Sequence, residues 1–375
     1  MSSDEHNPFT SHGVRLTRRH WTIVGLFSVV LFTVTPVFWK RAEKLEIEPD
    51  YRTPFSLSSD YWEYARYADI AAKRSDTLLI GDSVIWGQYV TREQTLSHYL
   101  NELAGHEQFA NLGLDGAHPL ALSGLIENYG EGISGKNVIL LCNALWMSSP
   151  KHDLQVEQEF HFNHPRLVPQ FSPGIPCYKE SMSARLGILV ERHVPFNAWT
   201  GHLQNAYFEH ADIPAWTLEH PYSFPLSAVS LRVPPSDNLL RHEAISWTER
   251  GAKKQSFPFV ELDKSLQWHA FQHTIETLQQ RGNTVFVMVG PLNEHMLDDT
   301  SLKSYVRVKS EIETWLKSKN IQCFVPTALP SEEYADASHP LSNGYRLLAR
   351  QLFDAFAKQH DRVVMQDENS ANQKK

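Results

Sequence analysis

The sequence predicts an α/β protein with three α/β/α layers, in which helices cover both faces of a parallel sheet, and a single N-terminal membrane helix. Short apolar runs alternate with helix-like stretches on both sides of a long proline-rich insertion, as expected for parallel strands joined by crossover helices. A run of 19 residues without charge precedes them. The chain has 375 residues, 42% of them hydrophobic, which is enough for one large α/β domain.

The membrane anchor is predicted at residues 21–39, which carry no charge and have a tryptophan at each end. At 1.5 Å per residue this run is about 28 Å long, close to the hydrocarbon thickness of about 30 Å. A buried core helix would show a polar stripe, and a cleaved signal peptide would end near a small-residue site instead of at Phe38 and Trp39. We therefore expect an uncleaved anchor behind a short, disordered tail at 1–20.

The orientation of the anchor is argued from the size of its flanks. Basic residues are balanced on its two sides, so the positive-inside rule does not decide. The short N-terminal tail and the large C-terminal part favour a catalytic domain outside the cytoplasm, which is the periplasm if the source is a Gram-negative bacterium. A net charge of −8 without a long basic run argues against nucleic acid as a partner.

The first half of the domain follows a charged connector at 40–75, which is expected to place a helix on the domain. An apolar strand at 77–80 ends at a Gly-Asp-Ser turn, and a helix with one apolar face is predicted at 92–104. The remaining elements of this half are a strand at 109–114, a helix at 119–129 and a strand at 138–141.

A change of composition marks residues 148–258 as an insertion, rich in proline, histidine and aromatic residues. We expect it to form a cap subdomain that influences substrate choice. Its aromatic residues fit either the core of the cap, which we favour, or stacking on sugar rings; they are Trp199, Tyr207, Phe208, Trp216, Tyr222, Phe224 and Trp247.

Regular alternation resumes after the insertion. The elements predicted there are helices at 261–281, 301–318 and 342–358, strands at 284–289 and 321–325, and a polar, disordered tail at 361–375. The catalytic domain is therefore expected to consist of residues 76–147 and 259–360.

Candidate catalytic side chains follow the predicted strands in order. Ser83 comes after the first strand, Gly113 ends the second, Asn143 follows the third, and Asp336 and His339 follow the fifth. Because the carboxyl ends of parallel strands meet at one edge of the sheet, we expect these residues to converge there. Each residue alone is an ordinary turn, cap or loop residue, but a serine, a histidine and an aspartate at one edge are a candidate nucleophilic triad.

This ordered set resembles the SGNH (GDSL-type) hydrolase superfamily. The resemblance covers roughly residues 76–146 and 284–356, and two blocks carry it: Ile80-Gly81-Asp82-Ser83 and Asp336-Ala337-Ser338-His339. The family commonly has Gly-x-Asn-Asp at its third block, whereas Cys142-Asn143-Ala144 keeps only the asparagine. The resemblance implies a flavodoxin-like fold, an SGNH hydrolase fold, with no cofactor and no metal.

The resemblance also implies a role for each matched residue. Ser83 would be the nucleophile, His339 would take its proton and return it to the leaving group, and Asp336 would orient His339. The backbone N–H groups of Ser83 and Gly113 and the side-chain amide of Asn143 would form the oxyanion hole.

Four more polar residues near predicted strand ends are candidates for substrate contact: Asp82, His118, Asn293 and His295. Asp82 also fits a helix cap or an anchor for the active-site loop, and the other three also fit solvated loops. A metal site at His152, Glu159, His161 and His164 is not favoured, because the spacing of known zinc motifs is absent and prolines flank the segment.

The resemblance implies acyl-ester chemistry, with water attacking the acyl group in an esterase and a sugar hydroxyl attacking it in an O-acyltransferase. Anchored members outside the cytoplasm move acetyl groups on polysaccharide or cell-wall glycan, often beside a membrane-bound O-acyltransferase. We therefore predict O-acetyl transfer to such a glycan, or removal from it, through an acyl-serine intermediate, with an acylated glycan or other acyl ester as substrate. The alternative is a non-catalytic scaffold or glycan-binding component of an envelope assembly.

Overall fold

The computed structural model describes residues 16–236 and 238–372, and its centre is a five-stranded, all-parallel sheet in the order β2-β1-β3-β4-β5. The strands are β1 (Thr77–Gly81), β2 (Phe109–Gly113), β3 (Asn137–Cys142), β4 (Thr284–Val289) and β5 (Gln322–Phe324). The predicted parallel sheet is confirmed. In this strand order the chain reverses direction across the sheet between β1 and β3, and ligands of doubly wound sheets bind beside that point.

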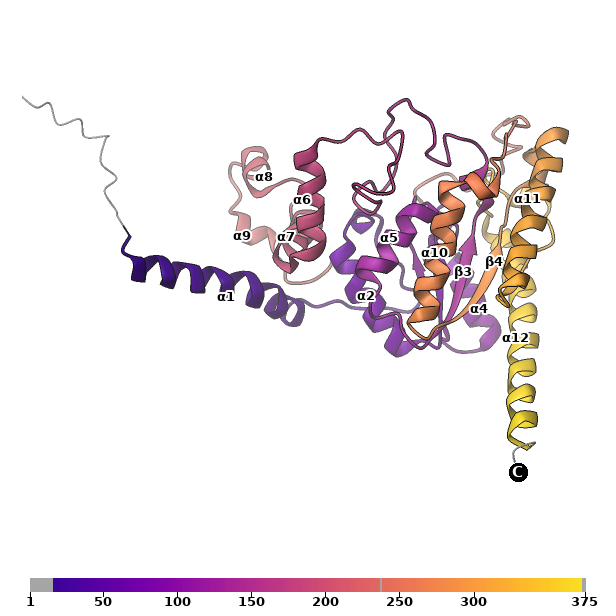
Figure 1. The fold of residues 1–375 in the computed structure, drawn as a ribbon, viewed down its shortest axis with the longest axis horizontal. Helices are drawn as coiled ribbons and strands as arrows, with labels where there is room; N and C mark the ends of the chain where they lie inside the picture. Colours follow the sequence, from indigo (N-terminus) through magenta and orange to yellow (C-terminus); the bar gives the residue numbers. More distant parts are fainter. Residues whose placement is uncertain (1–15, 237, 373–375) are drawn as a thin grey trace, which may run out of the picture.

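Helices cover both faces of the sheet (Figure 1). One face carries α2 (Tyr61–Arg74), α5 (Pro119–Tyr129), α10 (Leu266–Gln280) and α11 (Asp299–Ser318), and the other carries α3 (Ser83–Trp86), α4 (Leu96–Ala104) and α12 (Ser342–Asn372). The strands supply both cores because alternate side chains point to opposite faces. Leu140 packs under α5 and α10, for example, and Leu141 packs on the side of α4 and α12.

Several helices begin or end away from the expected residues, for local reasons. The helix expected at 92–104 starts only at Leu96, because the Thr95 side chain caps it by accepting from His98 N–H. Ser265 caps α10 in the same way, so this helix starts later than residue 261. The last helix continues to Asn372, past the expected end at 358, over a stretch without glycine or proline. Most of the N-terminal tail expected at 1–20 lies outside the described residues.

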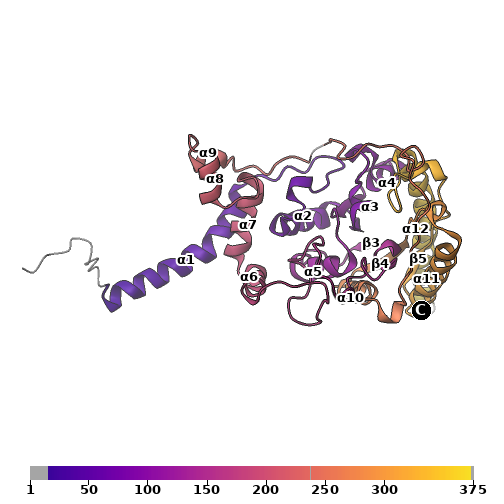
Figure 2. The ribbon, with the colours of Figure 1, turned by 90° about the horizontal axis from the view of Figure 1, so that it is seen from above.

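The insertion spreads over three places on the domain. Its first part packs against α5 and α10 through Leu154, Val168 and Cys177. Its middle part forms α6 (Met182–His193), α7 (Pro195–Tyr207), α8 (Ile213–Glu219) and α9 (Pro225–Ala228), which lie beside the N-terminal helix (Figure 2). Its last part adds the buried Trp247 to the core on the α12 side.

The helix α1 (Arg18–Ala42) extends away from the domain in both views and is long and apolar enough to cross a membrane. Its end is fixed to the domain by the buried carboxylate of Glu43, which follows it directly. Glu43 is bonded to Arg66 of α2, to His202 and Tyr207 of α7, and to Trp39 of α1 itself. Helix α1 is therefore joined to the domain through a buried polar network as well as through the chain.

Candidate active site

The turn after β1 presents Ser83 at the carboxyl edge of the sheet. Gly81 allows the tight passage, since a Cβ there would lie 2.6 Å from Ile85 and 2.7 Å from Leu141. Asp82 caps α3 by accepting from the Val84 N–H at 2.9 Å, and Ser83 is the first residue of that helix. Its own N–H therefore belongs to the first turn, whose N–H groups have no partner within a helix.

A turn after β5 holds Asp336 and His339. The Asp336 carboxylate accepts from the backbone N–H groups of Ser338 and His339 at 2.9 and 3.0 Å. Asn293 braces the same loop from the end of β4, donating its N–H to Ala337 O at 2.8 Å and its side-chain amide to Asp336 O at 3.1 Å. These hydrogen bonds hold Asp336 in place independently of its contact with the His339 imidazole.

The serine, histidine and aspartate form one connected line of hydrogen bonds. His339 Nδ1 lies 2.8 Å from Asp336 Oδ1, and His339 Nε2 lies 2.8 Å from Ser83 Oγ, across 256 residues of sequence. Because Nδ1 faces a carboxylate, it carries the ring proton and leaves Nε2 to accept from the serine hydroxyl. The predicted meeting of Ser83 and His339 is confirmed.

Electrostatics at the triad raise the pKa of His339 and lower that of Asp336. Burial opposes the imidazolium, but the negative charge and hydrogen bond of Asp336 outweigh burial and raise the pKa of His339 above its ordinary value. Burial also opposes ionisation of Asp336, yet the charge of His339 and three hydrogen bonds lower the pKa of that carboxyl to about 2. The acid therefore stays ionised wherever the histidine can work.

Asp82 is a buried organiser of the site. Its second carboxylate oxygen accepts from Asn143 Nδ2 and from Trp146 Nε1, both at 2.8 Å. The Asn143 side-chain oxygen accepts from Leu145 N–H at 3.1 Å, so the amide is oriented at both ends. An amide nitrogen has two hydrogens, and Asp82 takes only one of them. Both carboxylate oxygens of Asp82 already accept hydrogen bonds from within the protein, which leaves this residue unsuited to the substrate contact considered from the sequence.

Gly113 permits close packing at the site. A Cβ on this residue would lie 2.3 Å from the Trp86 backbone nitrogen, so any side chain would push α3 away from β2. Its N–H donates to the Asn111 side-chain oxygen at 3.0 Å. The Gly113 N–H would therefore serve an oxyanion only after leaving Asn111.

The other candidates for substrate contact have structural partners. His118 caps α5 and is 1% exposed, and it lies 3.1 Å from Asn163 O; burial lowers its pKa to about 3. Asn293 is the brace described above. His295 is exposed and lies 3.0 Å from Leu329 O.

The rim of the site contains residues that sequence reasoning missed. The Tyr89 ring lies 5.4 Å from the His339 ring and 5.2 Å from that of His242, and the guanidinium of Arg250 lies 5.0 Å above it. His242 and Arg250 belong to the insertion, so its last part reaches the triad. Apart from these residues, Asp115, two residues after Gly113 and so near a predicted strand end, interacts electrostatically with His339 and His242, and burial raises its pKa. The sequence did not indicate that Tyr89, His242 and Arg250 lie beside the triad, because the segment that contains His242 and Arg250 has no periodic pattern.

One group of possible metal ligands lies elsewhere, at the junction with α1: Glu43, Glu63 and His202. Arg66 forms ion pairs with both glutamates, and His202 also bonds Asp60 at 2.7 Å. These partners neutralise the group from within the protein. It is therefore a buried polar network.

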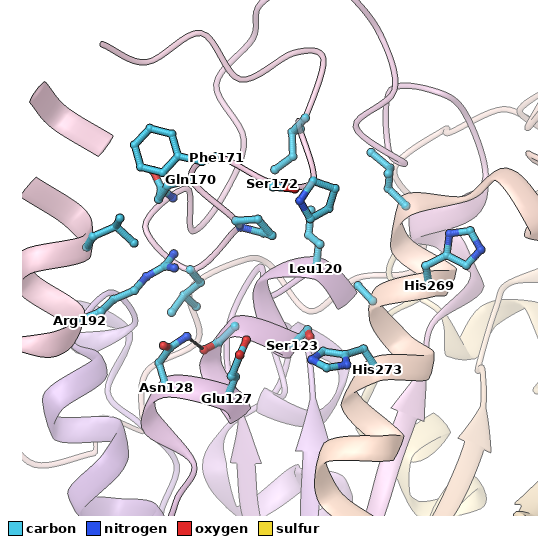
Figure 3. Close-up of a pocket in the computed structure, with 18 residues that line it drawn as sticks. Leu120, Ser123, Glu127, Asn128, Gln170, Phe171, Ser172, Arg192, His269 and His273 are labelled. Carbon is cyan, nitrogen blue, oxygen red and sulfur yellow. Dashed lines mark hydrogen bonds between the residues drawn. The ribbon is translucent and has the colours of Figure 1, made fainter. Parts of the chain in front are cut away.

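A hollow of about 690 Å³ lies over α5 and α10 (Figure 3). Leu120 and Ser123 of α5, His269 and His273 of α10 and Arg192 of α6 line it. None of the triad or oxyanion candidates is among its lining residues. The proposed chemistry therefore depends on the sheet edge, and this hollow takes no part in it.

Comparison with known proteins adds no assignment: the sequence matches no protein-family model and no curated protein.

Proposed function

We propose that the protein is a serine-dependent acyl-ester enzyme. The observation that carries this proposal is the unbroken line from Ser83 Oγ through His339 to Asp336, with 2.8 Å at each step. A histidine with a purely structural role does not require an unprotonated ring nitrogen beside a serine hydroxyl. A general base that activates a serine nucleophile does require this arrangement.

The proposed reaction has two halves. In the first half, Ser83 Oγ attacks the ester carbonyl carbon while His339 Nε2 takes the hydroxyl proton. The tetrahedral intermediate collapses, the ester C–O bond breaks, and His339 returns the proton to the leaving alkoxide. In the second half, water or a sugar hydroxyl attacks the acyl-serine and gives its proton to His339. The acid or the new ester is released, and the proton returns to Ser83.

Oxyanion binding is assigned to two donors. The Ser83 N–H belongs to the first turn of α3, and the Asn143 amide retains one hydrogen beyond its bond to Asp82. Removing one such donor in other enzymes costs roughly 3–4 kcal/mol of transition-state stabilisation. In this assignment Gly113 is not an oxyanion donor; its lack of a side chain lets α3 pack closely against β2.

The substrate class follows from the SGNH resemblance. Members that are anchored and act outside the cytoplasm work on acetylated glycans, so we propose O-acetyl transfer to, or removal from, a polysaccharide or cell-wall glycan. A membrane-bound O-acyltransferase is the proposed partner that supplies the acyl group. The rim beside the triad could contact a sugar, with an aromatic ring from Tyr89 and hydrogen-bonding groups from His242 and Arg250.

The test uses the full chain in detergent with p-nitrophenyl acetate. The wild-type protein should release nitrophenol, and Ser83→Ala should reduce the rate to the background. Ser123→Ala is the matched control, because this serine is equally buried, at 6% exposed, but lies on α5. Equal rates for wild type and Ser83→Ala would overturn the proposal in favour of the scaffold alternative. Mass spectrometry with an acetylated donor glycan and an unacetylated acceptor then distinguishes transfer from hydrolysis.

A further inference from the structure

The start of α7 lies against the middle of the anchor helix. The Phe196 ring lies 4.6 Å from the Phe32 ring, and the Trp199 ring lies 5.5 Å from the Trp39 ring. Phe32 precedes Trp39 by seven residues, or about 10 Å along the helix axis. Thus α7 runs alongside the last part of α1 and does not stop at its end.

The length of α1 decides where Phe196 lies if this helix spans a bilayer. Its uncharged run extends from Trp21 to Trp39, about 28 Å, which just matches the hydrocarbon core. If the membrane boundary lay at Phe32, so that Phe196 stayed in water, only residues 21–31 of α1 would lie within the hydrocarbon core. That stretch is about 16 Å long, roughly half of what a span requires. A spanning α1 therefore carries Phe196 into the bilayer.

The neighbouring helices expose large apolar side chains to solvent. On α6 they occur every fourth residue, at Met182, Leu186 and Val190, which places them on one helical face. Beyond α7 the exposed set is Ile213, Leu218, Tyr222, Phe224, Leu226 and Leu231, of which Tyr222 is fully exposed and Leu218 is 82% exposed. Single exposed apolar residues are ordinary, but this many on neighbouring helices beside a membrane-length helix indicate an interaction surface.

Charged side chains of α6 turn away from this surface. Arg185 donates to backbone carbonyls of Gln170 and Tyr178, and Arg192 donates to those of Arg166 and Val168. Glu191 pairs with Arg166. Residues 221–231, which include α9, carry no charge at all. On α6 and over residues 221–231 the outward face is therefore apolar, as an interfacial helix presents it to lipid, whereas Asp212 and Glu219, at the two ends of α8, are exposed.

Both views show how these helices lie relative to α1. Helices α6 to α9 gather beside the end of α1 that enters the domain, and α8 and α9 reach further along α1 than the sheet does (Figures 1 and 2). They are therefore the part of the domain placed to meet a bilayer first.

We propose that α6 to α9 form a monotopic platform in the bilayer that α1 spans, with their exposed apolar side chains among the lipid acyl chains. This inference rests on the expectation that α1 crosses the membrane. The required depth of about 10 Å at Phe196 agrees with the 5–10 Å at which interfacial helices lie. Lipid is the occupant because the platform continues the lipid-facing surface of α1. The length of α1 requires hydrocarbon at Phe196 whichever partner the protein has.

The experiment places a fluorescent label at single cysteines of the full chain in nanodiscs of phosphatidylcholine with brominated acyl chains. The background is Cys323→Ser, since Cys142 and Cys177 are buried. Leu226→Cys reports on the platform at an exposed position, where a label disturbs no core. Phe27→Cys reports on α1, and Val306→Cys, on the exposed side of α11, is the control outside the membrane.

Bromine should quench the label at 226 about twofold, approaching the quenching at 27, and should leave 306 unaffected. Quenching at 27 with none at 226 would overturn the platform but keep the span. An unquenched label at 27 would remove the span and the platform with it. A label at 226 that is unquenched in nanodiscs but shielded from an aqueous quencher in native membranes would assign the surface to a membrane protein. The ester assay on Ser83→Ala is independent of all four outcomes.

Discussion

Two buried histidines of this protein have nearly the same surroundings and are suited to opposite tasks. His202 lies between two carboxylates, 2.7 Å from Asp60 and 2.9 Å from Glu43. His339 lies between one carboxylate, that of Asp336, and the hydroxyl of Ser83. Both rings are buried, and each histidine has at least one ring nitrogen beside a carboxylate.

The second partner decides what each histidine can do. Burial opposes a charge on His202, but the two acids outweigh burial and raise the pKa of this histidine to about 10. At neutral pH both its nitrogens therefore carry protons, so the ring has no free lone pair. Opposite a hydroxyl, His339 has a nitrogen that can accept a proton and return it, as the proposed reaction requires. A buried histidine between two acids is structural, and one between an acid and a hydroxyl is equipped for catalysis.

The largest expected effect tests whether the triad acts as a unit. His339→Ala should lower kcat by about 10⁴-fold or more, and the double variant with Ser83→Ala should lose no more than either single variant. The measurement is ester hydrolysis with circular dichroism as the folding control. Losses that multiply in the double variant would show that the two residues do not share one step.

Asp336→Asn should lower kcat by about 10³- to 10⁴-fold, because the ring loses the acid that orients and stabilises it. The pH profile gives a second readout. In the wild type, kcat/KM should rise with pH as His339 loses its proton, through an apparent pKa above 6.5, since the neighbouring acid raises that pKa. Without the negative charge, the rise should move to lower pH. An unchanged midpoint would contradict the pairing.

Asn143→Ala should lower kcat by about 10²- to 10³-fold with little change in KM, as expected for a donor used in the transition state. Trp146→Phe is the matched variant, because it removes the other donor to the same Asp82 oxygen at 2.8 Å. It should keep most of the activity. A loss as large as that of Asn143→Ala would make both residues merely supports of Asp82.

His202→Gln should change kcat by less than about twofold and should lower the thermal unfolding midpoint by several degrees, because it leaves two buried carboxylates without their shared partner. The pKa of His202 is raised on folding, so its stabilisation is complete below pH 6.5 and disappears as the pH rises towards about 10. The gap in unfolding midpoint between wild type and variant should close over that range. His242→Gln, on the exposed rim, is the stability control.

The sequence was sufficient to predict the residues at strand ends. Ser83 could be located because it directly follows an apolar run, and His339 because the Asp336-to-His339 block follows the last predicted strand; parallel strands must deliver their ends to one edge. Helix limits were less predictable where side-chain caps such as Thr95 and Ser265 decide the first turn. The register of a cap depends on a single hydroxyl, which periodicity does not resolve.

Contacts that neither a strand end nor a motif marks could not be predicted from the sequence. The bond from Asn143 to Asp82 spans 61 residues, and His242 reaches Tyr89 from an insertion without periodicity. The insertion aromatics divided as well: Tyr207, Phe208 and Trp216 form a buried cluster, whereas Tyr222 and Phe224 are exposed. Composition indicated an insertion, but only packing determines which of its aromatic residues are buried.

The pairing of β3 with β4 has a consequence for synthesis. Asn137 pairs with Thr284, so the central strand β3 gains its neighbour β4 only across the whole insertion. At 5–20 residues per second, the ribosome needs roughly 7–30 s to make this stretch, and β3 has an open edge throughout that time. Chain closure over so long a loop is also slow. The newly made half-sheet is thus a natural client for a chaperone that shields strand edges.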